Sequence, residues 1–224
     1  MDIRRQLILT VAWLAASTAV ATAQTPVPYR VSSALSGGVK RALQRAGAEV
    51  AYVRLVRADG LSDYLVAAAW LPARETSTDY GPRVVVLRAY PTDSAEVVYV
   101  SDGLMDSTVP DLLAIAGPER TLILADMGDE GGSWGFAAYE ISPAGTRELA
   151  LLDVGVPGRA EIGESDGSAL PYTSGVWENG HWVVRIDTTV VWAPNQESPT
   201  RRLMPTRERA VSFELRDGGW VLRP

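Results

Sequence analysis

The sequence predicts a mainly β fold, an antiparallel meander of roughly ten strands with one short N-terminal helix. The strands would form a sandwich, an open barrel or a propeller-like stack. Two observations carry this prediction. Short runs of β-branched and aromatic residues follow one another along most of the chain, and Asn-Gly or Asp-Gly dipeptides separate several of them. No run is followed by a convincing crossover helix, which argues against a parallel α/β sheet.

The N-terminus has the pattern of a secretory signal peptide over residues 1–23. Arg4 and Arg5 precede Leu7–Val20, an apolar stretch of 14 residues, and small residues come directly before Gln24. We expect cleavage before Gln24, export across the cytoplasmic membrane, and a periplasmic or extracellular location. The alternatives are a buried helix, an uncleaved anchor and a twin-arginine signal. No later apolar stretch is long enough for a membrane span, so none is expected after cleavage.

The rest of the chain divides into a proline-containing tether, residues 24–36, and a single β-rich domain, residues 37–224. The predicted helix covers Gly38–Ala46, where apolar residues recur at helical spacing, and Gly47 ends it. Two longer segments, Gly155–Pro171 and Ala193–Thr206, are expected to be polar loops.

Turn dipeptides place the hairpins. Asp59-Gly60, Asn179-Gly180 and Asp217-Gly218-Gly219 each separate two apolar runs, and Asn-Gly and Asp-Gly accept the positive φ values of tight turns. The runs next to these turns are Val50–Val56, Leu61–Leu71, Val176-Trp177, Trp182–Val184, Val211–Leu215 and Trp220–Leu222. The other predicted strands are Arg83–Ala89, Glu96–Val100, Thr121–Ala125, Phe136–Ile141, Glu148–Leu152 and Thr188–Trp192.

The hairpin around Asn179-Gly180 can be predicted residue by residue. A two-residue turn places Glu178 opposite His181 and Trp177 opposite Trp182. The tryptophans then lie on a core face, whereas Glu178 and His181 lie on a mixed, solvated face as a cross-strand charge pair. The run Trp-Glu-Asn-Gly-His-Trp resembles the turn of designed tryptophan-zipper hairpins, which implies local structure and no activity.

Composition excludes several kinds of site. The chain has no cysteine, so it has no disulfide, thiolate metal site or cysteine nucleophile. A single histidine excludes sites that need two. The formal net charge of −6 argues against binding nucleic acid through a basic surface.

One acidic, glycine-rich loop is a candidate site. Asp126, Glu130 and Gly131 occupy the first, fifth and sixth positions of a calcium-loop pattern, but the third position has no side chain, so calcium is only a possible cofactor. Asp129 and Trp134 complete the candidate, with Trp134 either tucked over a sheet edge or exposed as a binding platform. Gly131–Gly135 also matches Gly-x-Ser-x-Gly, but a hydrolase elbow needs a strand before Ser133 and a helix after it. The flanking sequence predicts a loop and a strand.

We therefore expect a non-catalytic binding or interaction module for a protein or glycan partner. The candidate binding residues are Asp129, Glu130, Trp134, Glu178 and His181, and the candidate metal ligands are Asp126 and Glu130. Two alternatives stay open. One is a carboxylate-dependent hydrolase acting on glycans or peptides, and the other is a barrel carrier of a small apolar ligand.

Overall fold

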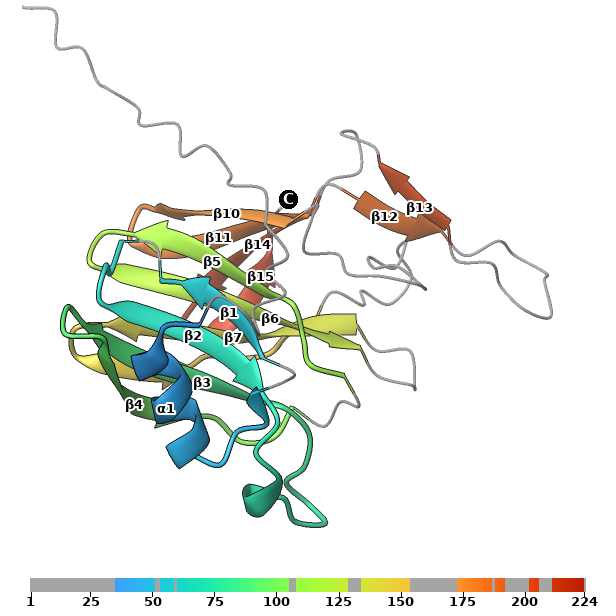
Figure 1. Cartoon of the computed structure of the whole chain (residues 1–224). Helices are drawn as coiled ribbons and strands as arrows, with labels where there is room; N and C mark the ends of the chain where they lie inside the picture. Colours follow the sequence, from blue (N-terminus) through green and yellow to red (C-terminus); the bar gives the residue numbers. More distant parts are fainter. Residues whose placement is uncertain are drawn as a thin grey trace, which may run out of the picture.

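The computed structural model describes residues 35–50, 53–58, 60–104, 108–128, 134–153, 173–186, 188–191, 202–205 and 211–223. These residues form a mainly β protein with three stacked antiparallel sheets and one α-helix (Figure 1). No sheet in this part of the chain closes into a barrel. The predicted mainly β class is confirmed.

The helix α1 (Gly37–Arg45) covers the outer face of the first sheet (Figure 1). Ser36 caps its N-terminus by accepting a hydrogen bond from the Val39 N–H at 3.3 Å, and Gly47 adopts φ +87° just past its end. The predicted helix is thus confirmed to within one residue at each end. No helix among the described residues is long and apolar enough to cross a membrane.

The first sheet is a meander in the order β1-β2-β3-β4. Its strands are β1 (Arg54–Arg57), β2 (Tyr64–Ala69), β3 (Arg83–Tyr90) and β4 (Ser94–Val100), and the short 3-10 helix η2 (Pro72–Arg74) lies between β2 and β3. The register shifts between Val86 and Leu87, which leaves Val98 as the extra residue of a β-bulge in the edge strand.

The second sheet is also a meander, in the order β5-β6-β7-β8, with β9 paired to β7. Its strands are β5 (Leu112–Gly117), β6 (Arg120–Gly128), β7 (Trp134–Ser142), β8 (Gly145–Glu148) and β9 (Leu152–Asp153).

The third sheet has the order β10-β11-β14-β15, so the chain leaves it once between β11 and β14. Its strands are β10 (Thr173–Glu178), β11 (His181–Ile186), β14 (Val211–Arg216) and β15 (Gly219–Leu222). The excursion contains a separate two-stranded ribbon of β12 (Thr188–Val191) and β13 (Arg202–Pro205). Both predicted hairpins of the third sheet are confirmed, and their turns are Asn179-Gly180 and Asp217-Gly218, with φ of +50° at Asn179 and at Asp217.

Three apolar clusters hold the layers together. The first joins α1 to the outer face of the first sheet, the second joins the first and second sheets, and the third joins the second and third sheets. Alternate residues of each strand enter different clusters, as the two-residue period of a strand requires. Both faces of the first two sheets are therefore buried, whereas the third sheet contributes only one face to a cluster.

The structure corrects three expectations. Residues 202–205 form β13 instead of belonging to a loop, with Pro205 at the end of a two-stranded ribbon, where its missing N–H is tolerated. β5 was not predicted, because its alanine- and glycine-containing sequence has weak strand propensity and its burial between layers outweighs that propensity. The segment 145–148 pairs as β8, so the strand predicted over 148–152 begins earlier and is interrupted. The predicted loop 155–171 lies outside the described residues.

Candidate functional site

The outer face of the third sheet is the strongest candidate surface. Its inward residues, including Trp182, Phe213 and Leu215, belong to the cluster shared with the second sheet, whereas none of its outward residues belongs to a described cluster. The register has no shift across the four strands, so the outward side chains form regular rows. The central row is apolar except for one carboxylate and consists of Val176, Val183, Glu214 and Val221. On one side of it lies a polar row of Ser174, Arg185, Ser212 and Arg223. On its other side, next to the hairpin turns, lies a third row of Glu178, His181 and Arg216.

Glu214 anchors the polar contacts of this face. The Glu214 residue is only 4% exposed. Its carboxylate accepts a hydrogen bond from Arg216 Nη2 at 2.8 Å and lies 3.2 Å from Arg223 Nε. The hydrogen bond from Arg216, together with the positive charges of Arg216 and Arg223, holds the pKa of Glu214 below its ordinary value, although burial opposes this. Arg223 also reaches Glu178, with Nη1 3.3 Å from Oε2. The face is therefore a connected ionic network in which Arg223 contacts both Glu178 and Glu214, and the pKa of Glu214 is lowered.

The predicted register around His181 is confirmed, but the predicted charge pair is wrong. Glu178 lies opposite His181 and Trp177 lies opposite Trp182. However, Glu178 pairs with Arg223, and His181 Nδ1 lies 3.1 Å from the Leu215 carbonyl oxygen. Since a carbonyl only accepts, this contact assigns the ring proton to Nδ1. Long arginine side chains from a distant strand compete for Glu178, which a single hairpin cannot reveal.

The electrostatics of this face differ from those of a carboxylate hydrolase. Such an enzyme needs one carboxyl group with a raised pKa to act as general acid. Here the pKa of Glu214 is lowered, and Arg223 bridges the two carboxylates of Glu214 and Glu178. The lowered pKa of Glu214 suits ionic recognition better than donation of a proton by this carboxyl group.

Beneath this face, Trp182 makes a polar link between the second and third sheets. Its indole Nε1–H donates to Glu140 Oε2 at 2.8 Å, and Glu140 also pairs with Arg120 and Arg147. The rings of Trp177 and Trp182 meet edge to face with centroids 4.9 Å apart, and Arg120 lies over Trp177. Sequence reasoning missed Glu140. Its position could have indicated a buried, paired carboxylate, because Glu140 follows Ala138 by two residues on a strand face that is otherwise apolar.

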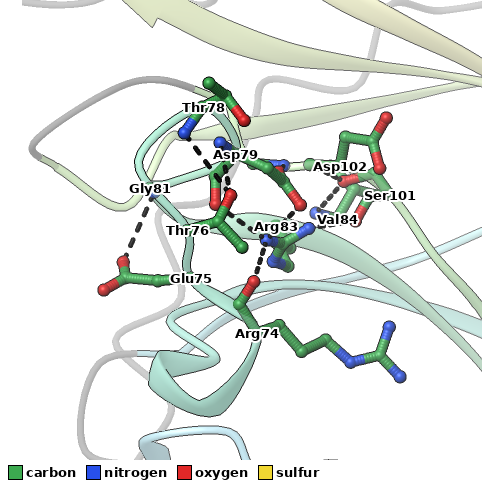
Figure 2. A network of polar contacts seen from close by, with 11 residues as sticks. Arg74, Glu75, Thr76, Thr78, Asp79, Gly81, Arg83, Val84, Ser101 and Asp102 are labelled. Atoms are coloured by element: carbon green, nitrogen blue, oxygen red, sulfur yellow. Dashed lines mark hydrogen bonds and ion pairs between the residues drawn. The ribbon is translucent and has the colours of Figure 1, made fainter.

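A second polar cluster surrounds Arg83 at the start of β3 (Figure 2). Arg83 is 2% exposed, and its guanidinium donates to the carbonyl oxygens of Ser101 at 3.0 Å and Arg74 at 3.1 Å. It also donates to Asp79 Oδ2 at 2.8 Å, and Asp79 Oδ1 accepts the Gly103 N–H. The contacts join the loop after η2 to residues 101–103. Because Arg83 donates to the protein's own backbone, we interpret this cluster as a structural clasp.

The residues of the predicted acidic loop do not form one described site. Asp126 lies in β6, and Asp126–Gly128 pair with Trp134–Phe136, so the first half of the proposed calcium loop is strand. Trp134 is the first residue of β7 and not the tip of a loop. Asp129, Glu130 and Ser133 lie outside the described residues. A strand follows directly after Ser133, where a hydrolase elbow would need a helix. Within the described part of the chain, no three His, Asp or Glu side chains gather as a metal site.

Comparison with protein families, curated proteins and solved structures finds no match to this chain.

The clasp and the Glu214 network predict acid sensitivity. The hydrogen bonds from Arg83 and the Gly103 N–H lower the pKa of Asp79 below its ordinary 3.8, and that of Glu214 is also lowered. These ionised groups stabilise the fold fully above their ordinary pKa values. The contribution is lost as pH falls through the lowered values, because the unfolded chain takes up protons first. We expect the free energy of unfolding, measured by urea denaturation, to decrease below about pH 4.

The variant Asp79→Asn is expected to lower stability near neutral pH and to flatten this acid-side slope. Glu119→Gln is the control, because Glu119 is exposed on the turn between β5 and β6 and has no ion pair with a described residue. An equal flattening in both variants would contradict the assignment to Asp79.

Proposed function

We propose that this chain is an exported, non-catalytic binding module that recognises a partner through the outer face of β10, β11, β14 and β15. The observation that carries the proposal is the uneven burial of the sheets. Both faces of the first and second sheets enter apolar clusters, whereas the third sheet presents one ordered face outside them. The export step rests on the signal-peptide pattern of residues 1–23.

The chemistry of the face supports a protein partner with acidic side chains. The face carries three arginines and one histidine against two glutamates, although the whole chain has a net charge of −6. In its central row, Val176 and Val221 at the two edge strands are exposed, whereas Val183 is buried. All the tryptophans of this sheet pack toward the second sheet, so the face has no aromatic platform for stacking a sugar ring. A protein segment with acidic and apolar residues matches these rows best.

A peptide-binding assay tests the proposal. The probes are two fluorescent synthetic peptides, one alternating Glu and Val and one alternating Lys and Val, together with the polysaccharide polygalacturonate as an acidic glycan. We expect fluorescence anisotropy to show binding of the Glu-Val peptide, with affinity that weakens as salt rises. Arg185→Glu, on the outer face, should reduce the affinity at least about tenfold, because a like charge then faces the acidic probe.

The matched control is Arg88→Glu, which reverses an exposed arginine on β3 in the first sheet. It should leave binding unchanged. Equal losses in the two variants, no binding at low salt, a preference for the Lys-Val peptide, or tighter binding of polygalacturonate would each overturn the proposed partner. Hydrolysis of either probe would overturn the non-catalytic assignment.

A further inference from the structure

Two edge strands of the described sheets, β5 and β10, combine six residues with an unshifted register and no charge inside the strand. β1 begins and ends with arginine, β4 carries the bulge at Val98, and β8, β9 and β15 have at most four residues. β5 lies in the middle layer and contacts β1 and β10 of the adjacent layers, so β10 has such a neighbour on one side only. Charges, bulges and short length are the usual devices that prevent edge-to-edge pairing. β10 has six residues, no register shift, and a single charge at its end, Glu178.

The turn after β10 determines which of its backbone groups point out of the sheet. In a two-residue hairpin, the residues that flank the turn exchange backbone hydrogen bonds, so Glu178 and His181 form such a pair. Since this pairing alternates along a strand, Val176 and Ser174 also direct their backbone groups toward β11. The N–H and C=O groups of Trp177 and Gly175 therefore point away from β11, toward the edge of the sheet.

This alternation restricts how two copies of β10 can pair about a two-fold axis. Residues whose backbone groups point away from β11 must lie opposite residues of the same kind in the second copy. The two-fold axis therefore passes through one residue of each strand, and not between two neighbouring residues. Only registers centred on Val176 or on Gly175 keep most of the strand paired. The register centred on Gly175 places Gly175 opposite the partner's Gly175. This central pair therefore has no side chains that could contact each other.

The register centred on Val176 is self-complementary. It places Val176 opposite the partner's Val176, so two exposed apolar side chains cover each other. It places Ser174 opposite the partner's Glu178, so a hydroxyl faces a carboxylate and the two like charges are kept apart. It also places Gly175 opposite the partner's Trp177 on the inward face, where Ile115 packs over Gly175 and Trp177 packs on Trp182. The matched contacts of this register are therefore the Val176 pair and the two pairs of Ser174 with Glu178.

From this complementarity we propose that β10 pairs antiparallel with β10 of a second copy, in the register centred on Val176. The two third sheets then become one continuous sheet of eight strands. The outer faces of both copies lie side by side, which doubles the surface that presents Arg185, Glu214 and Arg216. The pairing is independent of the acidic partner, but it would make binding to a repetitive partner bivalent.

Single-cysteine variants test the register directly, because the chain has no cysteine of its own. Residues that face each other in a non-hydrogen-bonded antiparallel pair have Cα atoms about 4.5 Å apart, within the range that a disulfide spans. We expect purified Val176→Cys to form a disulfide-linked dimer under mild oxidation. Val221→Cys is the matched control, since Val221 lies in the same row on the opposite edge strand and is 49% exposed against 38% for Val176. It should stay uncrosslinked.

Sedimentation of the unmodified protein provides the second measurement. A single strand pair is a small interface, so we expect dimers to accumulate only above about ten micromolar. Val176→Lys places two like charges face to face and should raise the dimer dissociation constant at least about tenfold, whereas Val221→Lys should not change it. A protein that stays monomeric throughout the concentration series, or crosslinking of Val221→Cys equal to that of Val176→Cys, would overturn the proposal. Neither result bears on whether the monomer binds an acidic peptide.

Discussion

Replacing Trp182 with alanine is expected to lower the free energy of unfolding by about 3–5 kcal/mol, the range found for removing a large aromatic side chain from a core. Trp182 is 0% exposed and contacts the cluster that joins the second and third sheets. Its loss leaves a cavity between two layers and also removes the indole donor of Glu140. Urea denaturation followed by circular dichroism measures the change, since the other tryptophans complicate fluorescence.

Two further variants separate the packing of Trp182 from its hydrogen bond. Trp182→Phe keeps most of the apolar contact and should cost clearly less than Trp182→Ala. Glu140→Gln keeps an acceptor for the indole but removes the charge that faces Arg120 and Arg147, so it reports the ionic part alone. Trp177→Ala is the control for loss of the aromatic pair, because Trp177 is only half-buried. If Trp182→Ala cost no more than Trp177→Ala, the stacked arrangement of the two sheets would be contradicted.

Replacing Arg83 with methionine is expected to have the second large effect, about 3 kcal/mol. Methionine fills similar volume but donates no hydrogen bond, so the carbonyl oxygens of Ser101 and Arg74 lose their donor. A buried acceptor left without a donor costs about 1–3 kcal/mol. We also expect the loop after η2 to lose protection from hydrogen exchange, because Arg83 fastens it to β3 (Figure 2).

Two control variants accompany Arg83→Met: one keeps the positive charge at position 83, and the other removes a different arginine from β3. Arg83→Lys keeps the positive charge but cannot present two nitrogen donors in a planar fork, so it should rescue only part of the stability. Arg88→Met removes an exposed arginine from β3 and should cost little. Equal stability of Arg83→Met and Arg88→Met would show that the clasp contributes nothing to the fold.

Features determined by neighbouring residues could be predicted from the sequence. Asn179-Gly180 and Asp217-Gly218 accept positive φ, so they specify two-residue turns, and the period of a strand then places Trp182 inward and His181 outward. The helix followed in the same way from apolar spacing and Gly47. These features depend on steric limits and periodicity over a few residues, which the sequence states directly.

Contacts between distant segments were decided by the tertiary structure alone. Arg223 is 45 residues from Glu178, and Glu140 is 42 residues from Trp182. No local sequence pattern connects such pairs, because these side chains come within contact distance only when the sheets have packed together. For the same reason, β5 and β13 became strands although their sequences favoured other structures.

The sequence by itself determined a mainly β chain, its tight hairpins, and which side chains of β10 and β11 lie together on one face. It also excluded disulfides and paired-histidine metal sites. The tertiary structure decided which sheet keeps one face outside the apolar clusters and which strands lie at the edges of the described sheets. Hydrophobic burial has no direction along the chain, so the partner of each apolar face depends on how all the layers pack. The outer face of the third sheet and the β10 edge are results of that packing.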